Sequence, residues 1–431
     1  MKRVMLVGGG ASRDHALATT LANSPEVSHV LFVPGNSAAE YRAALSGLPI
    51  SSAAVASQDI PGLVELAEME EIDLTLFGPN TPLIMGAVDH FSAAGLRVAG
   101  PTRAAARLEG SKVYAKNFML RHGIPSARFA VFTDTTRAAA FCRSRSWARV
   151  IKTDSLAYER GVAVTRDLPD ALAAIERIMV DEVLEPGGDA RVVIEERLEG
   201  PEITLCILSD GRDIKMLDAN VNYPRLYNGN AGPRTRGMGA VSPAPSVTER
   251  LQKRLLTEIA EPLVEGIAAQ GRPLVGAIFV DIIIQRGEPH VLDINVRFGD
   301  PATQVLLMRL QSDLFSLLQA CVDGNLGQMR IENDERPAVS VVVAAEGYPF
   351  KRSRGATVTL PEAIENETRR LDLGGIRWHD NQYVTTGGRV ATVTAIAETI
   401  DAARKSAYLG AEQVQFDGAN MRTDIADITS R

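Results

Sequence analysis

The first hundred residues alternate between short apolar runs and amphipathic stretches. Four runs are typical of buried strands, RVMLVGGG, HVLFVPGN, DLTLFGPN and LRVAGP, and HALATTLA and VELAEMEEI between them are typical of helices. This alternation predicts a parallel sheet that binds ligands at the carboxyl ends of its strands. Glycine-containing turns at residues 8–10, 34–36 and 78–80 each follow a strand, so we expect three loops to converge on one rim.

The pattern changes after residue 102. A helical segment carries LEGSKVYAKNFMLRHGIP, a strand-rich unit follows it, and LLMRLQSDLFSLLQACVDG is typical of a buried helix. After residue 332, short strands with one helix indicate a small α+β unit. We therefore predict a multidomain α/β and α+β protein with units at residues 1–102, 103–332 and 333–431.

The glycine run GGGASRDH after the first strand has two interpretations. It lacks the spacing and the distant acid of a dinucleotide fingerprint, which argues against a Rossmann oxidoreductase. It is either a plain turn before a helix or an anion site at the helix N-terminus. We expect His15 in that helix to pack or cap rather than to catalyse.

The segment VLDINVRFGDP, residues 291–301, is the most informative part of the chain. Strand alternation places Asp293, Asn295 and Arg297 on one face. Hard oxygen ligands suit Mg²⁺ held between protein and nucleotide phosphates, and the guanidinium suits the anion that forms as a phosphoryl group leaves ATP. The segment therefore predicts a phosphoryl-transfer site.

A second acid, Asp281, interrupts the apolar run GAIFVDIII. QRGEPH after this run predicts a hairpin turn, so the two strands should pair and bring Asp281 beside Asp293. A structural acid at a strand end is the alternative. Two carboxylates and an amide side by side favour a metal site.

Two segments supply lysines. Lys152 ends an apolar strand, where its charge is costly without an anionic partner such as a phosphate, and the next loop carries Arg160. Lys112 and Lys116 lie one helical turn apart, a spacing more typical of a solvated face.

A glycine- and proline-rich segment at residues 222–245 contains Arg225, Arg234 and Arg236. A structureless stretch of this length in a compact domain is usually functional or disordered. Arginines among glycines favour binding of carboxylate or phosphate.

The composition of the chain argues against several classes of partner. A net charge of −7 without a basic run argues against nucleic acid. Three cysteines without metal spacing favour a reduced cytoplasmic protein, and neither a signal peptide nor an apolar run of about 18 residues is found, which argues against a membrane location. Both a monomer and a homodimer fit the sequence.

The motifs VGGG, RDHALA, VPGN, GPNTPLIMG, ARLEGSK, VIEERLEGPE, GPRTRGMGAVSPAP, LDINVRFGDP and AEGYP occur in an order that resembles the phosphoribosylamine–glycine ligases, a family of ATP-grasp enzymes. The resemblance covers nearly the whole chain. It implies an N-terminal Rossmann-like (pre-ATP-grasp) domain, a central ATP-grasp with a lid lobe at about residues 125–192, and a small C-terminal α+β domain. It also implies that ATP phosphorylates a carboxylate and that an amine then displaces the phosphate, giving an amide, ADP and phosphate.

The resemblance also implies roles for particular residues. Residues implied to contact ATP are Lys112, Lys152, Glu195, Glu196 and Glu202. Residues implied to act on the transferring group are Arg297, Lys152 and Arg160. The small-molecule carboxylate and amine are expected beside Gly10, Arg13, Gly35, Asn36, Asn80, Arg225, Arg234, Arg236 and Asp300. Mg²⁺ or Mn²⁺ is expected on Asp281, Asp293 and Asn295.

The chain departs from the family's motifs in the lid loop, in the N-terminal domain and beside the substrate sites. The residues concerned are Ser155, Glu159, Arg160, Asn80, Arg234, Arg236 and Ala302. Two alternatives therefore stay open. One is a diverged paralogue that joins a more anionic carboxylate or amine in a specialised pathway, and the other is a non-catalytic nucleotide-binding protein.

Overall fold

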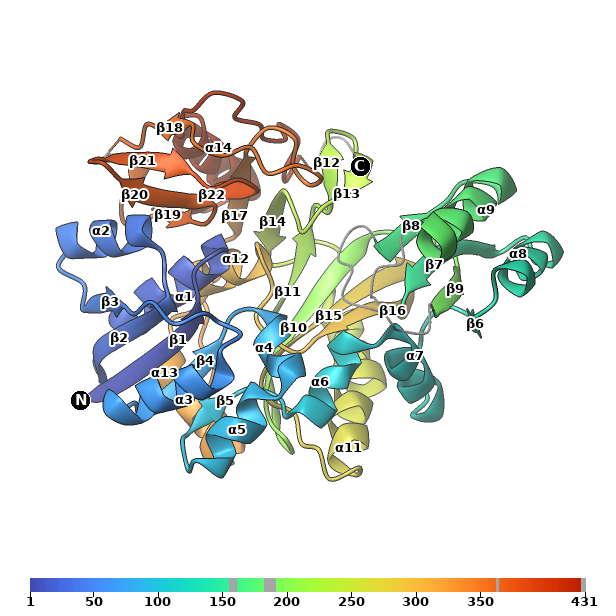
Figure 1. Cartoon of the computed structure of the whole chain (residues 1–431), viewed down its shortest axis with the longest axis horizontal. Coiled ribbons are helices and arrows are strands. Elements are labelled where there is room, and N and C mark those ends of the chain that lie inside the picture. The colour runs from blue at the N-terminus through green and yellow to red at the C-terminus, as the bar shows by residue number, and fades with distance from the viewer. Residues whose placement is uncertain (155–160, 182–190, 362–363, 428–431) are drawn as a thin grey trace.

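The N-terminal unit is a doubly wound α/β domain (Figure 1). The computed structural model describes residues 1–154, 161–181, 191–361 and 364–427. Five parallel strands pair in the order β3-β2-β1-β4-β5. They are β1 (Lys2–Gly8), β2 (Val27–Pro34), β3 (Ile50–Ser52), β4 (Leu74–Phe77) and β5 (Val98–Ala99), and the helices are α1 (Ser12–Ala22), α2 (Ser37–Leu45), α3 (Ile60–Met69), α4 (Asn80–Met85) and α5 (Ala87–Ala93).

The predicted parallel sheet is confirmed, and its strand order explains the rim of loops. The turns at residues 8–10, 34–36 and 78–80 follow β1, β2 and β4, which are neighbours in the sheet. Because parallel strands end at the same edge, the three turns lie together there. His15 in α1 is buried, and its Nδ1 accepts a hydrogen bond of 3.0 Å from the backbone N–H of Leu373, so it packs as expected.

The segment expected to form one helix after residue 102 forms two, α6 (Arg103–Gly110) and α7 (Lys112–Arg121). Ser111 lies between them in extended conformation, and its hydroxyl accepts from the backbone N–H of Tyr114. This N-cap starts a new helix and explains the break. The segment expected to form one buried helix likewise forms α12 (Ala302–Arg309) and α13 (Leu314–Asp323), the second capped by Asp313.

The part of the chain predicted to form the lid lobe lies at the right of Figure 1, drawn in teal and green. Its antiparallel sheet has the order β6-β9-β7-β8. The elements are β6 (Phe129–Phe132), α8 (Thr135–Ser144), β7 (Ala148–Thr153), β8 (Val162–Val164), α9 (Leu168–Glu176) with the π-helical turn η2 (Arg177–Asp181), and β9 (Val192–Glu196). The lobe has its own apolar core, which includes Ile151, Ile175 and Ile194.

An eight-stranded sheet joins the central and C-terminal units, in the order β16-β15-β10-β11-β14-β17-β22-β19. Its strands are β10 (Glu202–Asp210), β11 (Ile214–Asn222), β14 (Gly239–Ser242), β15 (Val275–Gln285), β16 (Glu288–Asn295), β17 (Ala338–Ala344), β19 (Arg369–Leu373) and β22 (Arg389–Ile396). The pairing of β14 with β17 carries the sheet across residue 332. The unit boundaries after residues 102 and 332 stay predictions.

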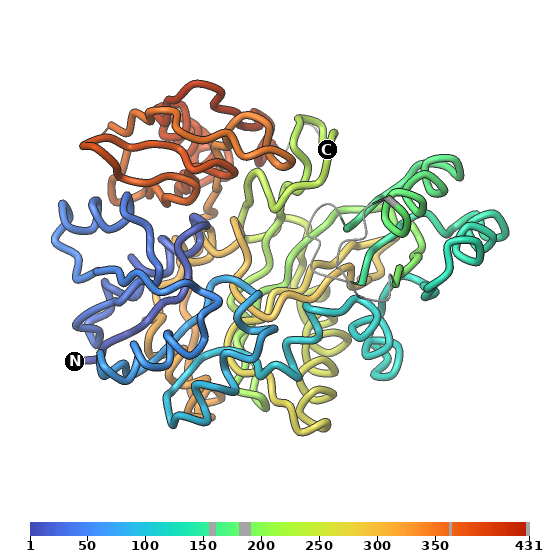
Figure 2. Tube along the Cα trace, in the orientation of Figure 1, coloured from blue at the N-terminus to red at the C-terminus, as the bar shows by residue number. Residues whose placement is uncertain are grey.

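Further elements complete the described part of the chain. They are the hairpin β12 (Arg225–Tyr227) and β13 (Ala231–Arg234), the helices α10 (Glu249–Leu255), η3 (Leu256–Ala260), α11 (Glu261–Ala268), η4 (Leu326–Gln328) and α14 (Ile400–Ala411), and a small sheet of β18 (Thr357–Val358), β20 (Ile376–His379) and β21 (Gln382–Thr385). The hairpin replaces part of the stretch expected to be structureless. In the view of Figure 2, the orange-to-red C-terminal unit lies directly above the blue N-terminal trace.

The turn after β1 gives the first testable prediction. Gly9 has a φ of +140°, and a Cβ placed on it would lie 2.1 Å from the backbone oxygen of Gly35. Gly9→Ala should therefore lower the free energy of unfolding by about 1–3 kcal/mol. Gly10→Ala is the matched control, because no atom lies within 4 Å of a Cβ at that position. Urea unfolding followed by circular dichroism measures both, and equal midpoints would contradict the prediction.

Candidate active site

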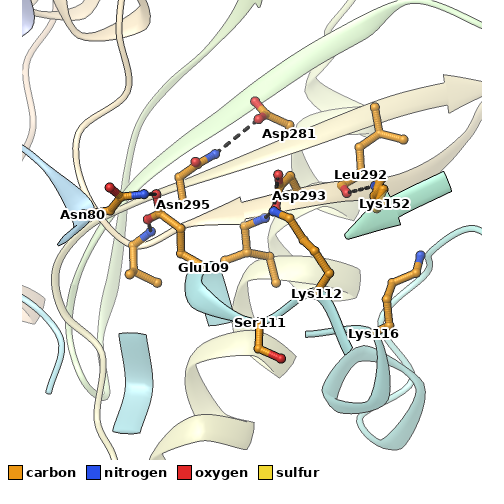
Figure 3. A network of polar contacts seen from close by, with 12 residues as sticks. Asn80, Glu109, Ser111, Lys112, Lys116, Lys152, Asp281, Leu292, Asp293 and Asn295 are labelled. Atoms are coloured by element: carbon orange, nitrogen blue, oxygen red, sulfur yellow. Dashed lines mark hydrogen bonds and ion pairs between the residues drawn. The ribbon is translucent and has the colours of Figure 1, made fainter. Parts of the chain in front are cut away.

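The predicted hairpin of β15 and β16 is confirmed, and it places Asp281 directly opposite Asp293 (Figure 3). Asp281 Oδ1 accepts 2.6 Å from the hydroxyl of Thr204 on β10, and Oδ2 accepts 3.2 Å from Nδ2 of Asn295. Burial raises the pKa of Asp281 to about 6. The three residues named as metal ligands thus lie together on one face of two paired strands.

Lys112 approaches this hairpin from the first turn of α7. Its Nζ donates to both carboxylate oxygens of Asp293, at 2.5 and 2.6 Å. Although burial opposes ionisation, the ammonium groups of Lys112 and Lys152 lower the pKa of Asp293. Burial alone would lower the pKa of Lys112, but the carboxylate of Asp293 raises it. Both groups are therefore charged at neutral pH.

Lys152 connects the lid lobe to the β15–β16 hairpin. Its Nζ donates 3.0 Å to the main-chain oxygen of Leu292, the residue before Asp293, and lies 3.1 Å from Oε1 of Glu195 on β9. Lys116 lies 3.5 Å from Oε2 of the same carboxylate. Glu195 thus pairs with two cations, Lys152 from the lid and Lys116 from helix α7.

Lys116 corrects the sequence interpretation. The spacing suggested a solvated side chain, but Lys116 is 2% exposed, and burial lowers its pKa to about 8. The reason is tertiary, since β9 supplies Glu195 as a partner and the segment before β6 supplies the main-chain oxygen of Ala127. Glu196, the next residue along β9, forms a bidentate pair with Arg128 near the surface.

Arg297 lies in the turn after β16 and contacts a carboxylate that sequence reasoning missed. Its Nε and Nη2 lie 3.2 and 3.1 Å from Oε1 of Glu109, and Nη2 also donates 3.1 Å to Oδ1 of Asn295. Asn80 Nδ2 donates 2.8 Å to the same oxygen of Glu109 (Figure 3). An acid within a short helix carries no distinguishing pattern, so the sequence held no signal for it.

A second cluster lies at the rim of the N-terminal sheet. Arg13 is paired with Asp14 and donates 3.1 Å to the main-chain oxygen of Phe298. Asp300 lies 2.6 Å from Nη2 of Arg389, a residue of the C-terminal unit that sequence reasoning also missed. Despite burial, Arg389 and Arg13 lower the pKa of Asp300. The rim therefore combines charges from all three units.

Two of the three arginines of segment 222–245, Arg225 and Arg234, lie directly opposite one another in the β12–β13 hairpin. Arg234 on β13 lies 3.4 Å from both carboxylate oxygens of Glu202. Arg225 donates to the main-chain oxygen of Gly232 within the hairpin, and the backbone N–H of Arg236 donates to the hydroxyl of Tyr348. The hairpin thus brings Arg225 and Arg234 together beside Glu202, and Arg225 also contacts the backbone of the β12–β13 turn.

The remaining predicted residues are loop positions. Asn36 caps α2 through Oδ1 and donates through Nδ2 to the main-chain oxygens of Gly9 and Gly374, so its amide is engaged within the protein. Gly10 is exposed, and Gly35 has a φ of +79° in the turn after β2. Arg160, Ser155 and Glu159 lie outside the described residues.

The donor set fits a divalent ion. In the described part of the chain no group of three or more His, Cys, Asp or Glu side chains could hold a metal. Two opposed carboxylates and an amide nevertheless suit an ion that completes its shell with phosphate oxygens and water. The ammonium of Lys112 on Asp293 shows that this place already attracts positive charge.

Family models match almost the entire chain. They are described as the N domain, the ATP-grasp (A) domain and the C domain of phosphoribosylglycinamide synthetase, and they match residues 2–109, 110–303 and 338–428. Phosphoribosylamine–glycine ligase of Allochromatium vinosum is 42% identical, covering 98% of this chain and 97% of that protein, and the enzyme of Ralstonia nicotianae is 42% identical over 98% of each.

The chain belongs to the phosphoribosylamine–glycine ligase family. A crystal structure of the Thermotoga maritima ligase has a TM-score of 0.84 and 30% identity, covering 98% of this chain and all of that one. A biotin carboxylase from Campylobacter jejuni has a TM-score of 0.74 at 15% identity, covering 97% and 92%, and shows the fold alone.

Family membership confirms the predicted fold class and the predicted enzyme class, an ATP-grasp ligase that forms a C–N bond with ATP and a divalent metal. Neither the diverged paralogue nor the non-catalytic nucleotide-binding protein is favoured by these comparisons. Among the described helices, none is long and apolar enough to span a membrane.

Proposed function

We propose that this chain joins glycine to phosphoribosylamine, the substrates in the name of its relatives, while ATP is converted to ADP and phosphate. The observation that carries the proposal is the meeting of lid and hairpin. Lys152 of the lid contacts Leu292 beside Asp293, and Lys112 contacts Asp293 itself. Cations for a polyphosphate and carboxylates for its metal ion are thus assembled in one place.

The metal ion is proposed to be Mg²⁺, with Mn²⁺ able to replace it, because hard oxygen donors on rigid strands suit either. Asp281, Asp293 and Asn295 would hold it. When bound, it offsets negative charge on the phosphates and orients them.

The protein's own groups supply the remaining steps. Lys112 and Lys152 bind the phosphates, and Glu195 holds the Lys152 ammonium in place. Arg297 faces the phosphoryl group as it passes to the glycine carboxylate, where a guanidinium stabilises developing charge. The amine of phosphoribosylamine then displaces phosphate from that acyl phosphate. Loops at the rim, with Arg13 and Asn80, hold this second substrate, whose phosphate suits a guanidinium.

Arg234 needs no extra negative charge on the substrate. Its guanidinium has Glu202 as a partner within the protein, and the pair raises the pKa of Arg234 although burial lowers it. One of the two arginines that suggested a more anionic substrate thus has a carboxylate partner within the protein. A cytoplasmic location and a monomeric or homodimeric state stay predictions from the sequence.

The proposed reaction is tested by ADP release from the purified chain. We expect release at roughly 1 to 10³ per second when ATP, Mg²⁺, glycine and phosphoribosylamine are all present, and background release when glycine or phosphoribosylamine is omitted. Equal release with aspartate in place of glycine would point to a different carboxylate. Absence of release with the complete mixture would overturn the proposal.

The metal site gives a second prediction. Asp293→Asn should lower turnover by about 10²-fold or more, because a preorganised charge is lost where the phosphates and the metal meet. Asp334→Asn makes the same chemical change at a carboxylate paired with Arg336, and it should leave turnover unchanged. Steady-state kinetics on both variants, with circular dichroism to verify folding, provide the measurement. Wild-type turnover by folded Asp293→Asn would remove this carboxylate from the mechanism.

Arg297 gives a third prediction. If the guanidinium acts mainly as the phosphoryl group transfers, Arg297→Ala should lower kcat with little change in the KM for ATP. Arg254→Ala is the control, since Arg254 pairs with Glu258 and Glu288 near the surface. A higher KM with normal kcat would instead make Arg297 a docking residue for ATP.

A further inference from the structure

Glu109 is a buried carboxylate in an unfavourable place. It lies in the last turn of α6, where the helix dipole opposes negative charge, and only 5% of its surface is exposed. Removing an ionised carboxylate from water is costly unless it is paired and hydrogen-bonded. Both the helix dipole and the loss of hydration disfavour the charged carboxylate of Glu109. Strong partners must offset these effects, and the contacts of Glu109 identify them.

The partners of Glu109 come from two units of the chain. Oε2 accepts 2.9 Å from the backbone N–H of Val296, in the segment that follows the metal-binding strand. Oε1 accepts 2.8 Å from Nδ2 of Asn80 in the N-terminal domain, and it also pairs with Arg297. One carboxylate therefore joins the start of α4 to the guanidinium proposed to face the phosphoryl group.

A second contact runs parallel to the first. The main-chain oxygen of Phe298 accepts from Nη1 of Arg297 at 3.0 Å and from Nη1 of Arg13 at 3.1 Å. The turn after β16 is thus held on one side by Glu109 and on the other by an arginine of the rim. Because both links end in the N-terminal domain, the direction of the Arg297 guanidinium depends on that domain.

We propose that Glu109 is a positioning residue that orients Arg297 and couples it to the Asn80 loop, where the second substrate is proposed to bind. The inference rests on the proposed function for the identity of that substrate. Glu109 touches no reacting atom and acts through Arg297. Its carboxylate keeps the guanidinium from turning away before the phosphoryl group arrives, which is how a remote group contributes to turnover.

The kinetic test compares Glu109→Gln with Glu109→Asp. Gln preserves length and loses the charge that pairs with Arg297, so kcat should fall by about 10- to 100-fold while the KM for ATP changes less than about twofold. Asp keeps the charge, and it should recover part of the lost kcat. Glu258→Gln is the control, since that carboxylate pairs with Arg254 near the surface. Normal kcat in folded Glu109→Gln would overturn the proposal.

Coupling to the N-terminal domain is tested with Asn80→Ala. If Asn80 acts on Arg297 through Glu109, the double variant at saturating phosphoribosylamine should have the kcat of Glu109→Gln alone, because the link is already broken and any direct loss of substrate binding at Asn80 appears in KM. Multiplied losses would show that the two residues act independently and would overturn the coupling.

Hydrogen exchange of the full chain without substrates separates this proposal from the proposed reaction. Glu109→Gln replaces charge-assisted bonds by weaker neutral ones, so peptides covering residues 78–85 and 292–299 should both exchange several-fold faster than in the wild type. Unchanged exchange in both peptides would overturn the proposal whatever the substrates are. A wild type that releases no ADP with glycine and phosphoribosylamine would overturn the proposed function alone.

Discussion

Charged side chains that leave water must meet opposite charges, and this requirement organises the candidate site. Glu195 meets Lys152 and Lys116, Asp293 meets Lys112, and Glu109 meets Arg297. For a buried pair such as Lys152 and Glu195, removing one partner typically costs about 3–5 kcal/mol, because an uncompensated charge remains. Each pair therefore fixes the position of a cation of the candidate site before any ligand arrives.

Every one of these pairs also joins separate elements. Lys112 on α7 reaches β16, Lys152 on β7 reaches both β9 and the backbone of β16, and Glu109 on α6 reaches the turn after β16. The lid lobe has its own apolar core. Lys152 links the lobe to the β15–β16 hairpin by a polar contact. The eight-stranded sheet gives β15 and β16 a rigid base, and its continuation into β17 and β22 brings Arg389 to Asp300.

Departures from the family's motifs find partners within this arrangement. Asn80 is one of these departures, and its amide donates to Glu109. Arg234 is another, and it pairs with Glu202. These replacements change hydrogen bonds while the proposed phosphate and metal ligands are kept. Retention of the proposed ligands fits membership of the ligase family better than loss of catalysis.

The sequence by itself determined the local features of this protein. Alternating apolar runs specified the parallel sheet, the turn QRGEPH specified the β15–β16 hairpin, and strand alternation placed Asp293 and Asn295 together. Arg297 lies beyond the end of β16 and reaches Asn295 from the following turn. These predictions succeeded because each depends on residues close together in the chain, where periodicity and turn chemistry act directly.

Only the tertiary structure decided which charges meet. Burial of Lys116, the role of Glu109, the Arg389–Asp300 pair and the Glu202–Arg234 pair all join residues far apart in sequence. The breaks at residues 111 and 310–313 depend on caps that outweigh a continuous helical pattern. Spacing along a chain carries no information about a partner on another element, because that partner is chosen by packing and by the need of each buried charge for an opposite one.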